Sequence, residues 1–252
     1  MSDRSSLGYM NKLQIGTSGR VYEHWMDIFY PLSLPSDRQL SFYAQHFSTV
    51  EINFSFYRLP ERSVFENWYK QTPSNFLFAV KGSRYLTHIK KLKDPIEPLS
   101  RLMERASGLQ EKLGAILFQF PHTWHLNLER LQPFLELLQT YPQQRFTVEF
   151  RHSSWLIPQV YKLLENAGVA LCLPVSPTFP LDLCLTIHWT YIRMHSGQWG
   201  VGYSDEELFR WARHIRSFLT QGINVYVYFN NDPDGHAIHD AQKLYMLLLS
   251  KD

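Results

Sequence analysis

The sequence predicts a (β/α)8 TIM barrel, a closed ring of parallel strands with helices outside it. Three observations predict this fold: eight short apolar runs, segments of helical periodicity between most of them, and a length of 252 residues. An open doubly wound sheet is the alternative. Against it, the turn from Gly16 to Gly19 is the one glycine-rich candidate after a strand, and it lacks the full G-x-G-x-x-G spacing.

The strand candidates are short runs rich in β-branched and aromatic residues. In chain order they are Leu13–Ile15, Thr49–Ile52, Phe76–Val80, Ala115–Phe118, Phe146–Phe150, Ala170–Leu173, Thr190–Met194 and Ile223–Phe229. Short apolar runs separated by helical segments are typical of parallel strands that are covered on both faces.

Capping patterns indicate where helices begin and end. Ser63 with Glu66, and Ser204 with Glu207, have the spacing of a capping box. Further boundaries are indicated by Asn127 and Ser154 as single N-caps, by Asp94-Pro95 as a start, by Gly168 and Gly222 as ends, and by Gly235 before a last helix over His236–Leu249. Between the sixth and seventh strands, Pro174–Thr186 contains three prolines, so we expect an irregular connection there.

Composition narrows the class of protein. No Gly/Ser-rich or Pro-rich linker interrupts the chain, so one domain over residues 1–252 is expected. Met1 to Asn11 lacks an apolar signal segment, and no apolar run approaches the ~20 residues of a membrane span. Cys172 and Cys184 belong to no metal-binding or disulfide pattern and fit a reducing compartment. We therefore expect a cytoplasmic protein with no membrane partner.

The charge balance makes any attraction for anions a local property. The chain has 25 basic and 23 acidic residues, a formal net charge of +2. This balance does not indicate a nucleic-acid partner through bulk electrostatics. Nucleic acid therefore remains a partner only if cations gather at one place.

Polar side chains recur at alternate positions in the strand candidates. Alternate side chains of a barrel strand point inward, and those between them, such as Val148 and Phe150, point to the helices. Lys81 and Gln119 end the third and fourth strands, at the carboxyl edge where barrel enzymes place their chemistry. The inward parity predicts one polar mouth formed by Glu51, Asn53, Glu149, Arg151, Tyr191, Arg193, His195, Tyr226, Tyr228 and Asn230.

These residue types suit acid–base chemistry on an anion. Glu149, His195 and Glu51 are the candidate catalytic residues, because carboxylates and imidazoles move protons near neutral pH. The candidate substrate-binding residues are cations and hydrogen-bonding groups: Lys81, Arg151, Arg193, Asn53, Gln119, His88, His152 and Asn230. The carboxylates of the mouth are Glu51, Glu149 and Asp232. Because the cations outnumber them, we expect a small anionic ligand.

Each candidate also has a structural interpretation. Glu149 and Arg151 could be a buried ion pair that fixes the barrel interior, and His195 could bond a backbone carbonyl. The segment Asn230–Asp232 before Gly235 suits a polar turn. The sequence identifies no cofactor. A divalent metal could be bound by Glu51, Glu149 and His195, but the neighbouring cations would repel it, so no metal site is predicted.

Several motifs in order resemble one family. They are Ile15–Gly19, Val50–Tyr57, Lys81 with Thr87-His88, Gln119–Pro121, Glu149–Trp155, Tyr191–His195 and Tyr228–Asp232 with Gly235. Together they are similar to the YecE-like family, a domain of unknown function, over about residues 13–249. The resemblance implies a TIM barrel related to the group that includes sugar isomerases and an apurinic-site endonuclease, with no established activity. The chain departs from the pattern at Val175, where the sixth strand of relatives tends to end in aspartate.

Two function hypotheses follow. The first is an enzyme, a hydrolase or an isomerase, that acts on an anionic substrate such as a phosphorylated sugar or a nucleic-acid fragment. The second is a catalytically inert barrel that binds nucleic acid or a phosphometabolite. Val175 favours the second, because an aspartate that serves the family's chemistry would be missing.

Overall fold

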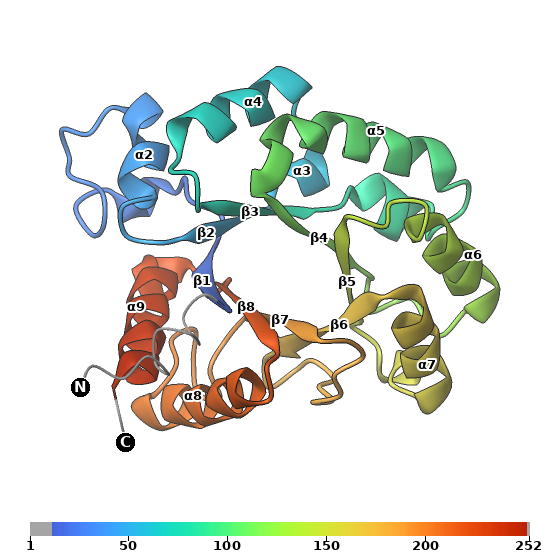
Figure 1. Cartoon of the computed structure of the whole chain (residues 1–252). Helices are drawn as coiled ribbons and strands as arrows, with labels where there is room; N and C mark the ends of the chain where they lie inside the picture. Colours follow the sequence, from blue (N-terminus) through green and yellow to red (C-terminus); the bar gives the residue numbers. More distant parts are fainter. Residues whose placement is uncertain (1–11, 251–252) are drawn as a thin grey trace.

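The strands form a closed parallel barrel in chain order. A computed structural model describes residues 12–250, and Met1 to Asn11, where we expect no signal segment, lie outside it. The order is β1-β2-β3-β4-β5-β6-β7-β8, and β1 pairs with β8 to close the ring (Figure 1). The strands are β1 Leu13–Ser18, β2 Thr49–Ile52, β3 Leu77–Lys81, β4 Leu113–Gln119, β5 Arg145–Glu149, β6 Val169–Val175, β7 Trp189–Met194 and β8 Asn224–Phe229. The predicted fold is confirmed.

Helices surround the ring on its outer side (Figure 1). They are α2 Gln39–Tyr43, α3 Phe54–Tyr57, α4 Arg62–Gln71, α5 Ile96–Ala106, α6 Leu128–Leu138, α7 Pro158–Ala167, α8 Asp205–Thr220 and α9 His236–Leu249. Short 3-10 turns supplement them, and a π-helical turn over Tyr85–Ile89 follows β3. No helix lies between β6 and β7, as the prolines of that connection predict. Within the described part of the chain, no helix combines the length and the apolar character that a membrane crossing needs.

Two of the predicted helix starts are wrong. Ser63 lies inside α4, whose N-cap is Glu61. Glu61, which follows Pro60, has extended backbone, so the helix begins at Arg62, before Ser63. Ser154 lies in a 3-10 turn, and α7 begins instead at Pro158, whose fixed φ suits the first helical position. The capping box of Ser204 and Glu207 is present, and Asn127 caps α6.

The barrel interior is filled by small residues facing large ones. Ala79, Ala115 and Ala170 on β3, β4 and β6 share a buried cluster with tyrosines of β7 and β8, among them Tyr191 and Tyr228. This packing confirms that the predicted inward parity points inward. It also fills the barrel below the carboxyl ends of the strands, so polar groups gather above it.

Register then places the polar residues at one height. Ser18 on β1 lies beside Glu51 on β2, and Gln119 on β4 lies beside Glu149 on β5. On the opposite side, Arg193 of β7 lies beside Tyr228 of β8. The carboxyl ends of these strands therefore deliver their side chains into one layer.

Candidate functional site

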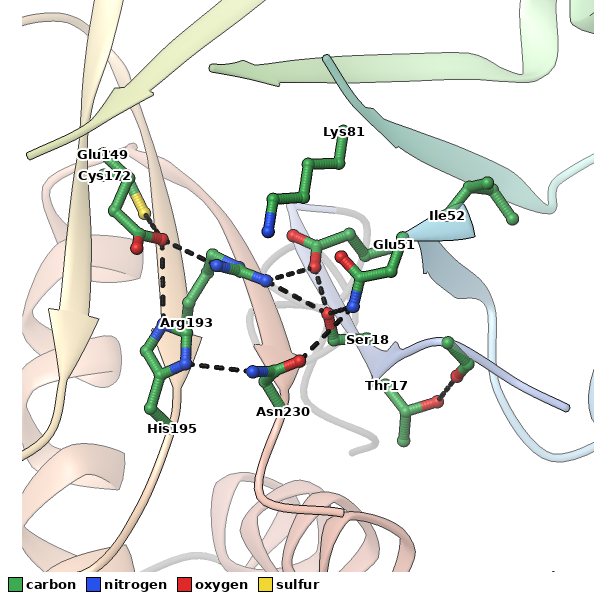
Figure 2. Close-up of polar contacts among 12 residues, drawn as sticks. Thr17, Ser18, Glu51, Ile52, Lys81, Glu149, Cys172, Arg193, His195 and Asn230 are labelled. Carbon is green, nitrogen blue, oxygen red and sulfur yellow. Dashed lines mark hydrogen bonds and ion pairs between the residues drawn. The ribbon is translucent and has the colours of Figure 1, made fainter. Parts of the chain in front are cut away.

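A buried guanidinium occupies the centre of the mouth. Arg193 Nη2 donates to Glu51 Oε1 at 2.7 Å, and Nη1 donates to Glu149 Oε2 at 2.9 Å (Figure 2). Burial opposes its charge, but the two carboxylates raise the pKa of Arg193 well above its usual value. One residue of β7 thus links β2 and β5. Removing one partner of such a buried network costs about 3–5 kcal/mol, because the remaining charge is left buried and unpaired.

Glu51 is an ionised carboxylate whose two oxygens both accept hydrogen bonds. Ser18 Oγ donates to Oε1, and Tyr191 Oη donates to Oε2 at 2.6 Å. Burial alone would raise the pKa of Glu51, but Arg193, Lys81 and the hydrogen bond from Ser18 together outweigh burial and lower it. Glu51 therefore acts as a fixed negative charge at neutral pH.

Glu149 is held in the same way by two arginines. Its Oε1 accepts from Arg151 Nε, and its Oε2 accepts from Arg193 and, at 3.6 Å, from Cys172 Sγ. Burial opposes ionisation, but Arg151 and Arg193 bring the pKa of Glu149 well below its usual value. Burial also raises the pKa of the Cys172 thiol well above normal, so the thiol stays a protonated donor. In this state Glu149 holds no proton that it could give.

His195 is a neutral imidazole. Arg151 Nη2 lies 3.0 Å from its Nε2, and a guanidinium only donates, so Nε2 accepts and carries no proton. Burial and the neighbouring Arg193 lower the pKa of His195 to about 4. Glu149 Oε2 is 3.7 Å from Nε2, which is too far for a hydrogen bond but close enough to attract a protonated ring.

Two asparagines join the halves of the network. Asn53 Nδ2 donates to Ser18 Oγ at 2.6 Å and to Asn230 Oδ1 at 3.3 Å. Asn230 Nδ2 lies 3.1 Å from His195 Nδ1 (Figure 2). Asn230 therefore lies between the Glu51 side and the His195 side of the mouth.

The ammonium group of Lys81 has no hydrogen bond or ion pair with any of the described residues. Its side chain is 9% exposed, and Nζ lies 4.3 Å from the centroid of the Phe56 ring. Figure 2 shows it extending from β3 toward Glu51 and Arg193. Burial and Arg193 lower the pKa of Lys81 to about 8, although Glu51 and Glu149 oppose this. The ammonium is thus charged at pH 7 and largely desolvated.

Three predicted binding residues lie at the mouth outside the network. His88 lies in the π-helical turn, 2.9 Å from Thr87 Oγ1, and burial together with Lys81 lowers its pKa to about 4. Gln119 is half-buried at the end of β4. His152 stacks on His125 with a centroid distance of 3.9 Å and bonds Ser154.

Asp232, expected to balance the cations of the mouth, has other partners. Its Oδ1 accepts from Trp25 Nε1 at 2.7 Å, and its Oδ2 lies 3.0 Å from His24 Nε2. Among the charged groups at the centre, the cations Lys81, Arg151 and Arg193 therefore face two carboxylates.

Sequence reasoning did not single out Ser18, Cys172 or Phe179. Ser18 forms hydrogen bonds with Glu51, Asn53 and, at 3.2 Å, Arg193. Its position at the end of β1, in register with Glu51, is the sequence feature that could have identified it. Phe179 lies in the β6–β7 connection. Arg151 Cζ lies over its ring, 3.6 Å from the ring centroid. No periodicity marks such a loop residue.

Comparison with known proteins decides the family. The family model described as "Protein of unknown function DUF72" matches residues 14–252. The chain belongs to this family. UPF0759 protein YunF of Bacillus subtilis (strain 168) is 24% identical over 255 residues, covering 88% of this chain and 90% of YunF. UPF0759 protein YecE of Escherichia coli (strain K12) is 30% identical over 128 residues, 50% of this chain and 46% of YecE.

Solved structures of DUF72 proteins share the barrel. The protein from Thermotoga maritima MSB8 has a TM-score of 0.84 and 29% identity, covering 94% of this chain and 99% of that one. One from Enterococcus faecalis V583 has a TM-score of 0.79 and 21% identity, covering 95% and 97%. The family model confirms the YecE-like assignment, and these structures confirm the TIM barrel. The DUF72 description names no activity, so any function has to be argued from the mouth.

Proposed function

We propose that the carboxyl mouth is an active site for acid–base chemistry on a small anionic substrate. The observation that carries the proposal is the Lys81 ammonium, which is buried beside Phe56 without an anionic partner among the described residues. A desolvated, unpaired cation binds a phosphate or carboxylate more strongly than one in water does. Lys81 is therefore assigned to the anionic group of the substrate.

His195 is assigned to the proton. An anion that draws the Arg151 guanidinium away would free His195 Nε2, which already lacks a proton. Once protonated, the imidazolium would face Glu149 Oε2, now 3.7 Å away. In this proposal Glu149 and Glu51 act through charge: Glu149 stabilises the imidazolium, and Glu51 fixes Arg193. Asn53 and Asn230 orient the substrate by hydrogen bonds, while Gln119, His88 and His152 line the approach.

Binding of inorganic phosphate, measured by titration calorimetry at pH 7.5, tests the role of Lys81. We expect Lys81→Met to weaken phosphate binding at least tenfold. Lys162→Met is the matched control, because Lys162 lies on α7, pairs with Glu165 and is exposed. Affinity should also fall as the pH rises through about 8, where Lys81 loses its proton. Unchanged binding by Lys81→Met would overturn the proposal.

Turnover separates an enzyme from an inert binding barrel. We expect a panel of phosphate esters and phosphorylated sugars to contain a substrate whose turnover His195→Gln lowers roughly 100-fold or more, with affinity nearly unchanged. His195 is the better test position, because Glu149→Gln would leave two buried arginines short of charge. The inert barrel is supported by the apolar Val175 at the end of β6. Tight phosphate binding without turnover of any panel member would favour it.

The location of this chemistry is part of the proposal. A free thiol at Cys172 and another at Cys184 suit a reducing compartment, which favours the cytoplasm.

A further inference from the structure

A second cavity adjoins the mouth. It has a volume of about 460 Å³ and lies between the loop after β1, the short helix α3 and the outer helix α4. Its walls are mostly aromatic, with Tyr22, Phe54, Tyr57 and Trp68 among the lining residues. Tyr57 is 79% exposed and Phe54 is 59% exposed. Exposed rings around a cavity of this size are typical of a site for a planar ligand group.

This aromatic cleft borders the mouth at Ser18. Tyr22 Oη donates to the Ser18 carbonyl at 2.7 Å, and Asn53 Nδ2 donates to Ser18 Oγ at 2.6 Å. Both Tyr22 and Asn53 also line the cleft. The cleft and the mouth are therefore neighbouring sites.

Arg20 is an unused donor at the cleft, and Asn53 holds an unused acceptor buried behind the cleft wall. Asn53 Oδ1 is buried and has no hydrogen-bond partner among the described residues. Arg20 also lines the cleft, with Cζ 5.8 Å from the centroid of Trp68, and it has no ion pair in the part of the chain that the structure describes. A buried acceptor and a guanidinium without a carboxylate call for a ligand with both N–H donors and acceptor atoms.

We propose that the aromatic cleft binds the nucleobase of a nucleoside phosphate whose phosphate lies on Lys81. This inference rests on the proposed function of the mouth. The base edge matches the cleft: ring nitrogen or carbonyl acceptors can take a hydrogen bond from Arg20, and an amino or ring N–H can donate to Asn53 Oδ1 once the Asn53 side chain turns toward the ligand. Tyr57 and Phe54 offer the faces on which a base stacks, as aromatic side chains do in proteins that bind unpaired bases.

The test compares three probes by titration calorimetry: adenosine 5′-monophosphate, ribose 5-phosphate and inorganic phosphate. We expect the nucleotide to bind at least tenfold more tightly than ribose 5-phosphate. Tyr57→Ala should remove about tenfold of nucleotide affinity, consistent with the loss of one stacking partner, and leave ribose 5-phosphate unchanged. Arg20→Gln should weaken the nucleotide only. Phe209→Ala, which removes an exposed ring on α8, is the matched control.

The outcomes separate this inference from the function on which it rests. Equal affinities for nucleotide and ribose 5-phosphate, both dependent on Lys81, would overturn the base site and leave the anion site standing. An equal loss for both in Tyr57→Ala would assign the cleft to the sugar and overturn the base. If none of the three probes binds, the anion site itself fails.

Discussion

At the scale of single residues, stability and binding conflict at Lys81. Burial lowers the pKa of Lys81 from 10.5 to about 8, so the folded protein holds a charge that its surroundings disfavour. A difference of this size corresponds to roughly 3 kcal/mol at pH 7. Active sites commonly retain such unfavourable groups, because a ligand compensates for them.

Lys81→Met should therefore stabilise the free protein. We expect its melting temperature at pH 7 to lie several degrees above that of the wild type, since each kcal/mol shifts a chain of this size by roughly 2–4 °C. Between pH 8 and 10.5 the unfolded wild type binds a proton that the folded wild type has lost, so wild-type stability rises with pH and the gap narrows. Calorimetric scans at pH 7 and pH 10 measure both effects. A variant less stable than the wild type at pH 7 would contradict this account.

His195 acts with the same sign as Lys81, but in a window on the acid side of neutrality. Burial and Arg193 lower its pKa to about 4, so the unfolded chain gains this proton near pH 6.5, before the folded chain does. The stability that His195 contributes is complete above pH 6.5 and is lost as the pH falls toward 4. We expect His195→Gln to lose less free energy of unfolding than the wild type over this window. Stability is measured by denaturant titration of both proteins across this pH range. His88 is present in both, so its contribution cancels in the difference between their free energies of unfolding. Parallel pH curves would refute the assignment.

At the scale of elements, strands were easier to predict than helix starts. A strand of the barrel is buried on both sides, so its apolar run records the whole environment. A capping box records only a local spacing, and at Ser63 the preceding Pro60-Glu61 decides the start. Substitution of Ser63 and Ser204, which share the capping-box spacing, can measure the difference between a spacing alone and a true cap.

Ser204→Ala should lower the free energy of unfolding by about 1 kcal/mol, because Ser204 caps α8 with both bonds of the box to Glu207. Ser63→Ala is the matched control. Ser63 lies within the first turn of α4, so its loss should change stability by less than about 0.5 kcal/mol. Denaturant unfolding of the two variants checks this. Equal effects would mean that Ser204 has no special role.

Much of the mouth was also predictable, for a physical reason. Alternation along a strand decides which face a side chain takes, and this placed Glu51, Glu149 and Arg193 together. It does not decide how far a side chain reaches or what a loop covers. Gln119 thus stays outside the network, while Phe179, from a segment without periodicity, packs on Arg151.

At the scale of the whole molecule, the nearly balanced charge limits how nucleic acid could bind. The formal net charge is +2, and the mouth and the aromatic cleft contribute two cations without ion pairs, Lys81 and Arg20, among the residues described. For single strands, the logarithm of the affinity falls with the logarithm of the salt concentration by about 0.7 for each phosphate neutralised. With one or two phosphates held, we expect a slope of about −0.7 to −1.4 for a short single-stranded oligonucleotide between 50 and 200 mM salt. Fluorescence anisotropy measures this slope, with Lys81→Met and Lys162→Met compared. A slope of −4 or steeper would instead indicate a surface that tracks many phosphates, and the site would then be a strand-binding face rather than a pocket for one nucleotide.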